Sequence, residues 1–212
     1  MTENKPMLTI WGRITSINVR KAVWAAEELE IPYKRIDAGG AFGLTKTPEY
    51  LSMNPNSVVP TLVDGDFTLW ESNVVVRYLC AKHSLGNLYP ENLQERFNAE
   101  RWMDWQQTTF SPSGRDAFWQ LIRIPGPEQD TKKIEASIAS TNILLDRFED
   151  HLSKQAFVAG PKLTMADIPM ACEIHRWYGL PIERKPRKHI EAWYEKMNAR
   201  PASKKVLTYP LS

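Results

Sequence analysis

The spacing of apolar residues changes along the first part of the chain. A short apolar run at residues 8–11 is typical of a strand, and a helical pattern with apolar positions at Val19, Ala26 and Leu29 follows it. We therefore expect a helix at 18–30. The segment that joins the two, "WGRITSINVRK", is predicted to be a strand-to-helix junction.

Three further segments extend this region. Residues 33–37 predict a second short strand, and 39–50 predict a loop with one helical turn. Residues 58–72, "VVPTLVDGDFTLWES", predict a hairpin around an Asp-Gly turn, and 71–84 predict a helix with Ser72 near its N-cap. A βαβ unit makes parallel strands and a hairpin makes antiparallel ones, so the order βαβ-ββα predicts a mixed four-stranded sheet.

Helical patterns replace the strand patterns after residue 92. Residues 93–110 predict a helix that "SPSG" at 111–114 interrupts or ends, and 115–123 predict its continuation. The clearest helix spans 133–152, where apolar residues recur in steps of three and four.

The end of the chain is also helical. In "LTMAD", Thr164 is a candidate N-cap, and Asp167 three residues later suits the positive end of a helix. One more helix precedes Pro201. We therefore expect an α/β domain at 1–83 followed by an all-α domain at 90–212.

Composition excludes several classes of function. The formal charge of +2 is too small to indicate nucleic acid or an anionic membrane as a partner. The start "MTENKPM" is not a signal peptide, and no apolar run is long enough to span a membrane. Cys80 and Cys172 are predicted to be buried thiols of a reducing compartment, and the four His have no metal-ligand spacing. The basic cluster at 184–188 is interpreted as a solvated loop or a partner patch.

Several motifs, taken in order, resemble the cytosolic glutathione S-transferase family over essentially the whole chain. The stretch "NPNSVVPTLVDGDFTLWESNVVVRYL" (54–79) is similar to the family's glutathione-site signature. "LTMADIP" is similar to its core-helix capping motif, and "ARPASKKVL" (199–207) to its C-terminal stretch. The opening "LTIWGRITSINVRK" resembles a bacterial branch near the theta, delta and beta classes.

The resemblance implies a thioredoxin-like N-terminal domain that binds glutathione as co-substrate. The Val59-Pro60 bond would be cis, so that the backbone of Val59 pairs with the cysteinyl part of glutathione. Glu71 would bind the γ-glutamyl ammonium and Ser72 its carboxylate. Lys46 would bind the glycyl carboxylate, although a solvated lysine is an alternative there.

The junction supplies the catalytic candidates. In theta and delta enzymes a catalytic Ser lies four residues before an Arg, and Ser16 and Arg20 have this spacing. Those classes usually place Pro-Cys between the two, whereas this chain has Asn18-Val19, so Asn18 is the alternative to Ser16. A hydroxyl at a helix N-terminus would favour the glutathione thiolate, since both stabilise an anion.

The size of this effect points to the second domain for selectivity. Lowering a thiol pKa by two units raises the thiolate fraction about 25-fold. The same change lowers the nucleophilicity of the thiolate by roughly 8-fold, so the net rate gain is only about 3-fold. Larger acceleration must come from positioning the electrophile. Phe110, Arg115 and Trp119 are the candidates for that pocket, beside the expected helix break. Asp104 would reach the γ-glutamyl ammonium across a dimer interface, or is a surface residue.

The sequence thus predicts a cytoplasmic, homodimeric enzyme that transfers glutathione to small electrophiles such as activated halides, with no metal. Two alternatives stay open. One is a glutathione-dependent peroxidase or isomerase that uses the same site. The other is a non-catalytic binding protein of this family.

Overall fold

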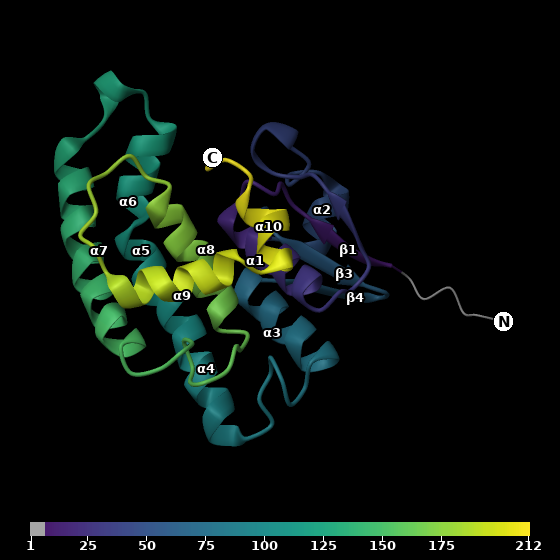
Figure 1. The fold of residues 1–212 in the computed structure, drawn as a ribbon. Helices are drawn as coiled ribbons and strands as arrows, with labels where there is room; N and C mark the ends of the chain where they lie inside the picture. Colours follow the sequence, from purple (N-terminus) through teal and green to yellow (C-terminus); the bar gives the residue numbers. More distant parts are fainter. Residues whose placement is uncertain (1–6) are drawn as a thin grey trace.

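The computed structural model describes residues 7–212 and contains a four-stranded sheet in the order β2-β1-β3-β4 (Figure 1). β1 pairs with β2 in parallel, and β3 pairs with both β1 and β4 antiparallel. The predicted mixed sheet is confirmed. Its strands are β1 (Leu8–Trp11), β2 (Tyr33–Ile36), β3 (Thr61–Asp64) and β4 (Phe67–Trp70). Residues 1–6, which include most of the stretch examined for a signal peptide, lie outside the described residues.

Helices cover both faces of this sheet. Leu8 and Ile10 of β1 are buried in one core with residues of α1 (Ile17–Glu28) and α3 (Ser72–His83). Because side chains alternate along a strand, Trp11 faces the other side, where its ring contacts Tyr50 edge-on. Tyr50 belongs to α2 (Pro48–Met53), which the short helix η1 (Gly40–Phe42) precedes.

The helix that starts at Leu93 does not end at the Ser-Pro-Ser-Gly motif. Pro112 removes one N–H from the helical ladder, and the turn just before it is widened into a π-helix. Gly114 forms a one-residue turn between two helical segments, so the motif interrupts the helix and residues 115–123 continue it, as one of the two predicted outcomes has it. The consecutive segments are α4 (Leu93–Trp105), η2 (Gln106–Phe110), α5 (Ser111–Ser113), α6 (Arg115–Phe118) and η3 (Trp119–Arg123).

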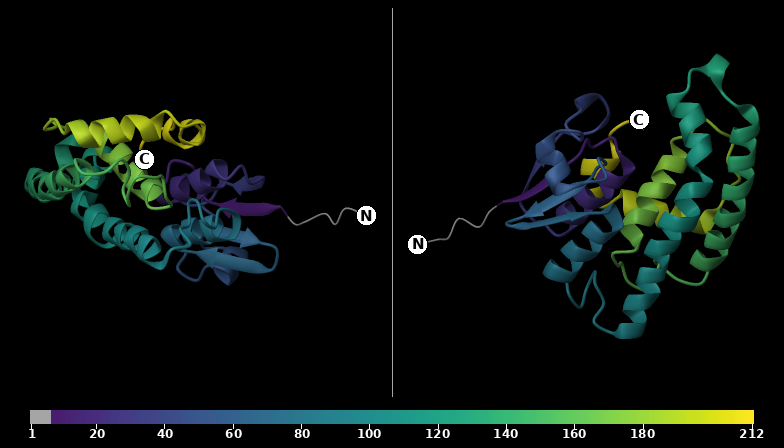
Figure 2. Two further views of the ribbon diagram at one scale, coloured as in Figure 1. Left: turned by 60° about the horizontal axis from the view of Figure 1, so that its bottom comes forward. Right: turned by 180° about the vertical axis from the view of Figure 1, so that it is seen from behind.

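The remaining helices complete the helical part, which stands beside the sheet in both views of Figure 2. They are η4 (Gly126–Glu128), α7 (Thr131–Leu152), α8 (Asp167–Tyr178), α9 (Lys188–Asn198) and α10 (Pro201–Leu207). None of the helices between residues 7 and 212 combines the length and apolar character needed to cross a bilayer.

The capping signal before α8 is confirmed in part, because Asp167 lies in the first turn of the helix as predicted. The buried carboxylate of Asp167 accepts hydrogen bonds from the backbone N–H groups of Thr164 and Val158, both 2.9 Å away, and from Trp193 Nε1. Thr164 itself lies before the N-cap position. The motif therefore fixes the loop before the helix and one residue of α9 at the same time.

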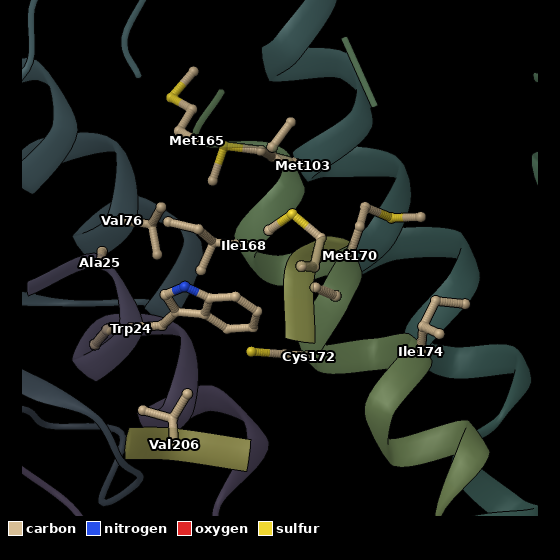
Figure 3. Close-up of a cluster of buried hydrophobic side chains, with 14 of the residues drawn as sticks. Trp24, Ala25, Val76, Met103, Met165, Ile168, Met170, Cys172, Ile174 and Val206 are labelled. Atoms are coloured by element: carbon tan, nitrogen blue, oxygen red, sulfur yellow. The ribbon is translucent and has the colours of Figure 1, made fainter. Parts of the chain in front are cut away.

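The two parts of the chain share one apolar core (Figure 3). Trp24 of α1 lies among Val76 of α3, Ile168 and Cys172 of α8, and Val206 of α10. α10 and α8 both pack against α1. Burial raises the pKa of the Cys172 thiol to about 12, as it does for Cys80, so both cysteines are buried thiols as predicted.

The basic cluster at 184–188 is neither a fully solvated loop nor a free patch. Arg187 is buried, and its guanidinium donates to Asp146 and to the side chain of Asn142 on α7. Lys185 pairs with the same Asp146. The cluster therefore fastens the loop between α8 and α9 onto α7.

Candidate active site

A cavity of about 390 Å³ lies between the sheet-containing part and the helical part. Its walls come from the β1–α1 junction, the start of α3, the segment 107–123, α8 and the last residues of the chain. The lining residues are Thr15, Ser16, Ile17, Asn18, Arg20, Lys21, Glu71, Ser72, Gln107, Ser111, Pro112, Arg115, Phe118, Trp119, Arg123, Arg176, Leu211 and Ser212.

Ser16 occupies the N-cap position of α1 and lines the cavity. Its side chain does not cap the helix, and among residues 7–212 its hydroxyl has no hydrogen-bond partner. The hydroxyl is therefore available to a ligand at the positive end of the α1 dipole. Gly12 allows the strand to pass this close to α1, because a Cβ there would lie 2.4 Å from Val19 Cγ2.

Asn18 and Ser72 connect the start of α1 to the start of α3. Ser72 Oγ donates to Asn18 Oδ1 over 3.3 Å. This bond leaves the amide N–H groups of Asn18 without a partner in the described part of the chain, so Asn18 also has a donor to offer. Ser16 and Asn18 thus line the same space, and the geometry does not separate the two candidates.

Glu71 is held in an unusual backbone conformation. Its φ of 70° is in the left-handed region, which costs a residue with a side chain of order 1–3 kcal/mol. The side chain is exposed, and Gln107 Nε2 donates to its Oε2 over 3.2 Å. Glu71 is also the N-cap of α3, although its side chain does not cap. The strained residue presents its carboxylate to the cavity beside the first amides of α3.

Val59, Pro60 and Lys46 lie outside the lining of this cavity. The Val59-Pro60 bond is cis, as the resemblance implied. The backbone N–H and C=O of Val59 have no hydrogen-bond partner within residues 7–212, so they are open to an extended ligand. Lys46 is exposed in the loop before α2.

Asp104 is on the exposed surface, with 69% of its side chain accessible. It forms an ion pair with Arg77 of α3, which also pairs with Glu100. None of the three lines the cavity. Within one chain, Asp104 is therefore separate from Ser16 and Glu71.

The three predicted pocket residues separate into two groups. Arg115 and Trp119 line the cavity, and Trp119 is 42% exposed. Phe110 is only 1% exposed, and its ring stacks on Trp105 with centroids 5.3 Å apart. The assignment of Phe110 to the pocket is wrong in this structure. Phe110 lies in the π-helical turn before the interruption, and its side chain belongs to the buried core.

A buried polar network forms part of the cavity wall and was not predicted from the sequence. Lys21 Nζ donates to Gln106 Oε1 over 3.0 Å, and Gln106 Nε2 donates to Glu173 over 3.0 Å. Glu173 also pairs with Arg176, whose guanidinium donates to Ser111. Burial lowers the pKa of Lys21 to about 8. The network joins α1 to the segment 106–111 and to α8.

Arg20, half of the predicted Ser-Arg spacing, binds the end of the chain and not the open space. It is buried and donates to the carbonyl oxygens of Tyr209 and Pro210, each 2.7 Å away. Arg123 donates to the backbone oxygen of Ser212 over 2.8 Å. These bonds hold Leu211 and Ser212 against the cavity. Their sequence separations exceed any local motif, so no local pattern predicts these bonds.

The described residues 7–212 contain no group of three or more His, Cys, Asp or Glu side chains that could hold a metal ion. The chemistry available in this cavity is hydrogen bonding to an anion, charge pairing and apolar contact.

Comparison with known proteins identifies the family. The model "Glutathione S-transferase, N-terminal domain" matches residues 6–81, and "Glutathione S-transferase, C-terminal domain" matches residues 107–201. Glutathione S-transferase GstB of Escherichia coli (strain K12) is 38% identical over 208 residues, which cover 97% of this chain and 100% of the relative. The chain belongs to the glutathione S-transferase family. Glutathione S-transferase F10 of Arabidopsis thaliana is 30% identical and covers 94% of this chain and 96% of its own.

Solved glutathione S-transferases share the fold. The theta-class glutathione S-transferase from Xanthomonas axonopodis pv. citri, solved with glutathione bound, superposes with a TM-score of 0.94. It is 44% identical, and the match covers 98% of this chain and 100% of that one. The family, the fold and the theta-like bacterial branch expected from the motifs are confirmed. The chain is a glutathione transferase with glutathione as co-substrate.

Proposed function

We propose that Ser16 stabilises the thiolate of bound glutathione and that the thiolate attacks a small electrophile, such as an activated halide, in the same cavity. The observation that carries this proposal is the unpartnered Ser16 hydroxyl at the N-terminus of α1, facing the cavity that Glu71 and Ser72 also line. A hydrogen bond to a charged group contributes roughly 1.5–3 kcal/mol, enough for a thiol pKa shift of about one to two units.

The cavity supports one orientation of glutathione. The γ-glutamyl ammonium would pair with the Glu71 carboxylate. The γ-glutamyl carboxylate would accept from the first amides of α3 and from Ser72, whose hydroxyl would exchange its bond to Asn18 for this one. The free backbone groups of Val59 would pair with the cysteinyl residue. Lys46 would approach the glycyl carboxylate. This order would bring the sulfur near the start of α1.

The transfer step uses few protein groups. The thiolate sulfur forms a bond to the electrophilic carbon, and the carbon–halogen bond breaks with its electron pair leaving on the halide. The thiol proton is released to solvent when glutathione binds as the thiolate. Arg115 would stabilise the charge that develops on the leaving group or on an electron-poor ring.

Two measurements test this function. Retention of the protein on immobilised glutathione tests binding, and glutathione-dependent consumption of an aryl halide above the uncatalysed rate tests transfer. We expect both. Retention without turnover would support the non-catalytic binding protein instead.

We also propose that the enzyme is a cytoplasmic homodimer. Leu93 and Phe97 of α4 are 62% and 61% exposed, and Val74 of α3 is also exposed. Together with the Arg77–Asp104 pair they form a mixed apolar and charged face outside the cavity. Light scattering should give about twice the 24.4 kDa chain mass. A monomer at all concentrations would refute the dimer and remove Asp104 from any neighbouring site.

A further inference from the structure

The charge of the cavity lining is uneven. Its titratable side chains are five cations and one carboxylate: Arg20, Lys21, Arg115, Arg123, Arg176 and Glu71. Counting Glu173 of the buried network behind the wall leaves five cations against two carboxylates. Glutathione bound as the thiolate brings two carboxylates and one thiolate against one ammonium, so its binding still leaves positive charge in the cavity.

The five cations are not equally available. Three of them already have partners within the protein. Arg20 donates to backbone carbonyls, Lys21 donates to Gln106, and Arg176 forms an ion pair with Glu173. Arg115 is exposed, and among residues 7–212 it has no hydrogen-bond, ionic or aromatic partner. Arg123 is the second accessible cation, with one bond to the Ser212 backbone oxygen.

Arg123 stands beside apolar surface, and Arg115 lines the same cavity. The Arg123 guanidinium lies 4.6 Å from the centre of the Trp119 ring and 5.2 Å from that of Phe118. Trp119, Phe118 and Leu211 all line the cavity. A flat apolar group can therefore rest on Trp119 while an anionic group on it reaches a guanidinium, which binds carboxylates through two parallel hydrogen bonds.

We propose that the preferred second substrate is a small electrophile that carries an anionic group, in the simplest case a carboxylate on an aromatic ring. Arg115 binds the anion, Arg123 assists it, and Trp119 contacts the ring. The inference rests on the proposed transfer function and specifies its substrate class. In the reaction the glutathione thiolate displaces halide from the electrophilic carbon, and the anionic group takes no part in bond making.

A matched pair of substrates tests the charge alone. 4-(Bromomethyl)benzoate and 4-(bromomethyl)benzamide have the same shape and the same reacting carbon. For each, kcat/KM at saturating glutathione is divided by the uncatalysed rate constant with glutathione. We expect the normalised value for the benzoate to exceed that for the benzamide about 5-fold, the factor that one charge pair 4 Å apart gives in bulk water. Raising the ionic strength should reduce this ratio.

Arg115→Gln should lower the benzoate-to-benzamide ratio about 5-fold, and Arg123→Gln should lower it less. Arg147→Gln is the matched control, because Arg147 is exposed on α7 and does not line the cavity. It should leave the ratio unchanged. Competitive inhibition of the unmodified enzyme by benzoate and by benzamide gives a second reading that needs no variant, and benzoate should be the stronger inhibitor.

Three results would overturn the inference. A wild-type ratio at or below one, with the benzamide turned over, would leave the transferase function intact and exclude anion selection. If Arg115→Gln left the benzoate-to-benzamide ratio unchanged and raised the KM for glutathione, the Arg115 guanidinium would bind glutathione and not the second substrate. If neither bromide is consumed faster than without enzyme, the proposed transfer function itself fails and the inference fails with it.

Discussion

At one end of the cavity the lining groups are two hydroxyls, an amide and a carboxylate on loop-to-helix junctions. At the other end they are guanidinium groups and an indole ring on an irregular helix and beside the last residues of the chain. Ser16, Asn18, Glu71 and Ser72 have short side chains or a fixed backbone, so their polar atoms have little freedom. Arg115 and Arg123 have long side chains and are exposed.

This difference separates two tasks. Short groups at helix N-termini suit a ligand that never changes, because their positions follow from the backbone. Long flexible cations and an exposed aromatic ring can adjust to ligands of different shape. The buried network from Lys21 to Arg176 connects the two ends, so a change there should affect the whole cavity.

Removing the charge at the centre of that network should have the largest effect. Glu173→Gln leaves the buried Lys21 and Arg176 without their carboxylate, and losing one partner of a buried ion pair costs about 3–5 kcal/mol. Chemical denaturation of the two proteins measures the change in the free energy of unfolding. Glu135→Gln, an exposed position on α7, is the control and should change it by less than ~0.5 kcal/mol. A loss below about 1 kcal/mol in Glu173→Gln would show that the network is not a rigid link.

Ser16→Ala should raise the pKa of the bound glutathione thiol by about one to two units, because the lost hydrogen bond stabilises only the anion. Glutathione affinity measured below the thiol pKa should stay within a few-fold. Thiolate absorbance of the complex, followed against pH, gives the value. Asn18→Ala is measured in parallel. A shift in Asn18→Ala with none in Ser16→Ala would transfer the role to Asn18.

Glu71→Gln and Ser72→Ala should weaken glutathione binding itself, by roughly 1–3 kcal/mol each, since each removes a charge-assisted hydrogen bond. Gln keeps the length of the side chain at a position whose backbone is strained. Titration calorimetry of each variant provides the affinity. Arg115→Gln provides the contrast, with glutathione affinity expected to change less. Native affinity in both Glu71→Gln and Ser72→Ala would mean that the pair serves only the start of α3.

The smallest predicted effect, taken per pH unit, concerns stability against pH. Burial lowers the pKa of Lys21 from 10.5 to about 8, so between those values the unfolded chain holds a proton that the folded chain has released. Stability rises with pH wherever the unfolded state binds more protons, so Lys21 contributes a positive slope of at most ~1.4 kcal/mol per pH unit in that window. The free energy of unfolding is measured against pH for wild type and for Lys21→Met. The difference between the two slopes isolates the contribution of Lys21 from the titration of tyrosines and cysteines. Equal slopes would mean that the ammonium is not desolvated.

The sequence predicts the first end of the cavity better than the second. The strand-to-helix junction, the hairpin and the Glu-Ser start of α3 are local patterns, and a local pattern determines where its own side chains point. The placement of Ser16, Asn18, Glu71 and Ser72 around one cavity agrees with that expectation, although their roles stay predictions.

The second end depends on contacts that no local pattern records. Lys21 and Gln106 are 85 positions apart, and Arg20 and Pro210 are 190 apart. The widened turn at Gln106–Phe110 also changes the register of the helix within that turn, and a pattern of 3.6 residues per turn does not anticipate it. Phe110 therefore lies in the core while Arg115 and Trp119 line the cavity.

The position of Lys21 has a consequence for recombination between relatives. Lys21 belongs to the N-terminal domain at residues 6–81. The groups that accept its hydrogen bond or balance its charge, Gln106 and Glu173, belong to the helical part. A chimera that joins residues 1–83 of this chain to the helical half of another transferase would bury an unpaired charge unless the incoming half supplied both groups. The two halves therefore have to be exchanged together with their polar contacts. Sequence identity within either half does not measure whether such an exchange succeeds.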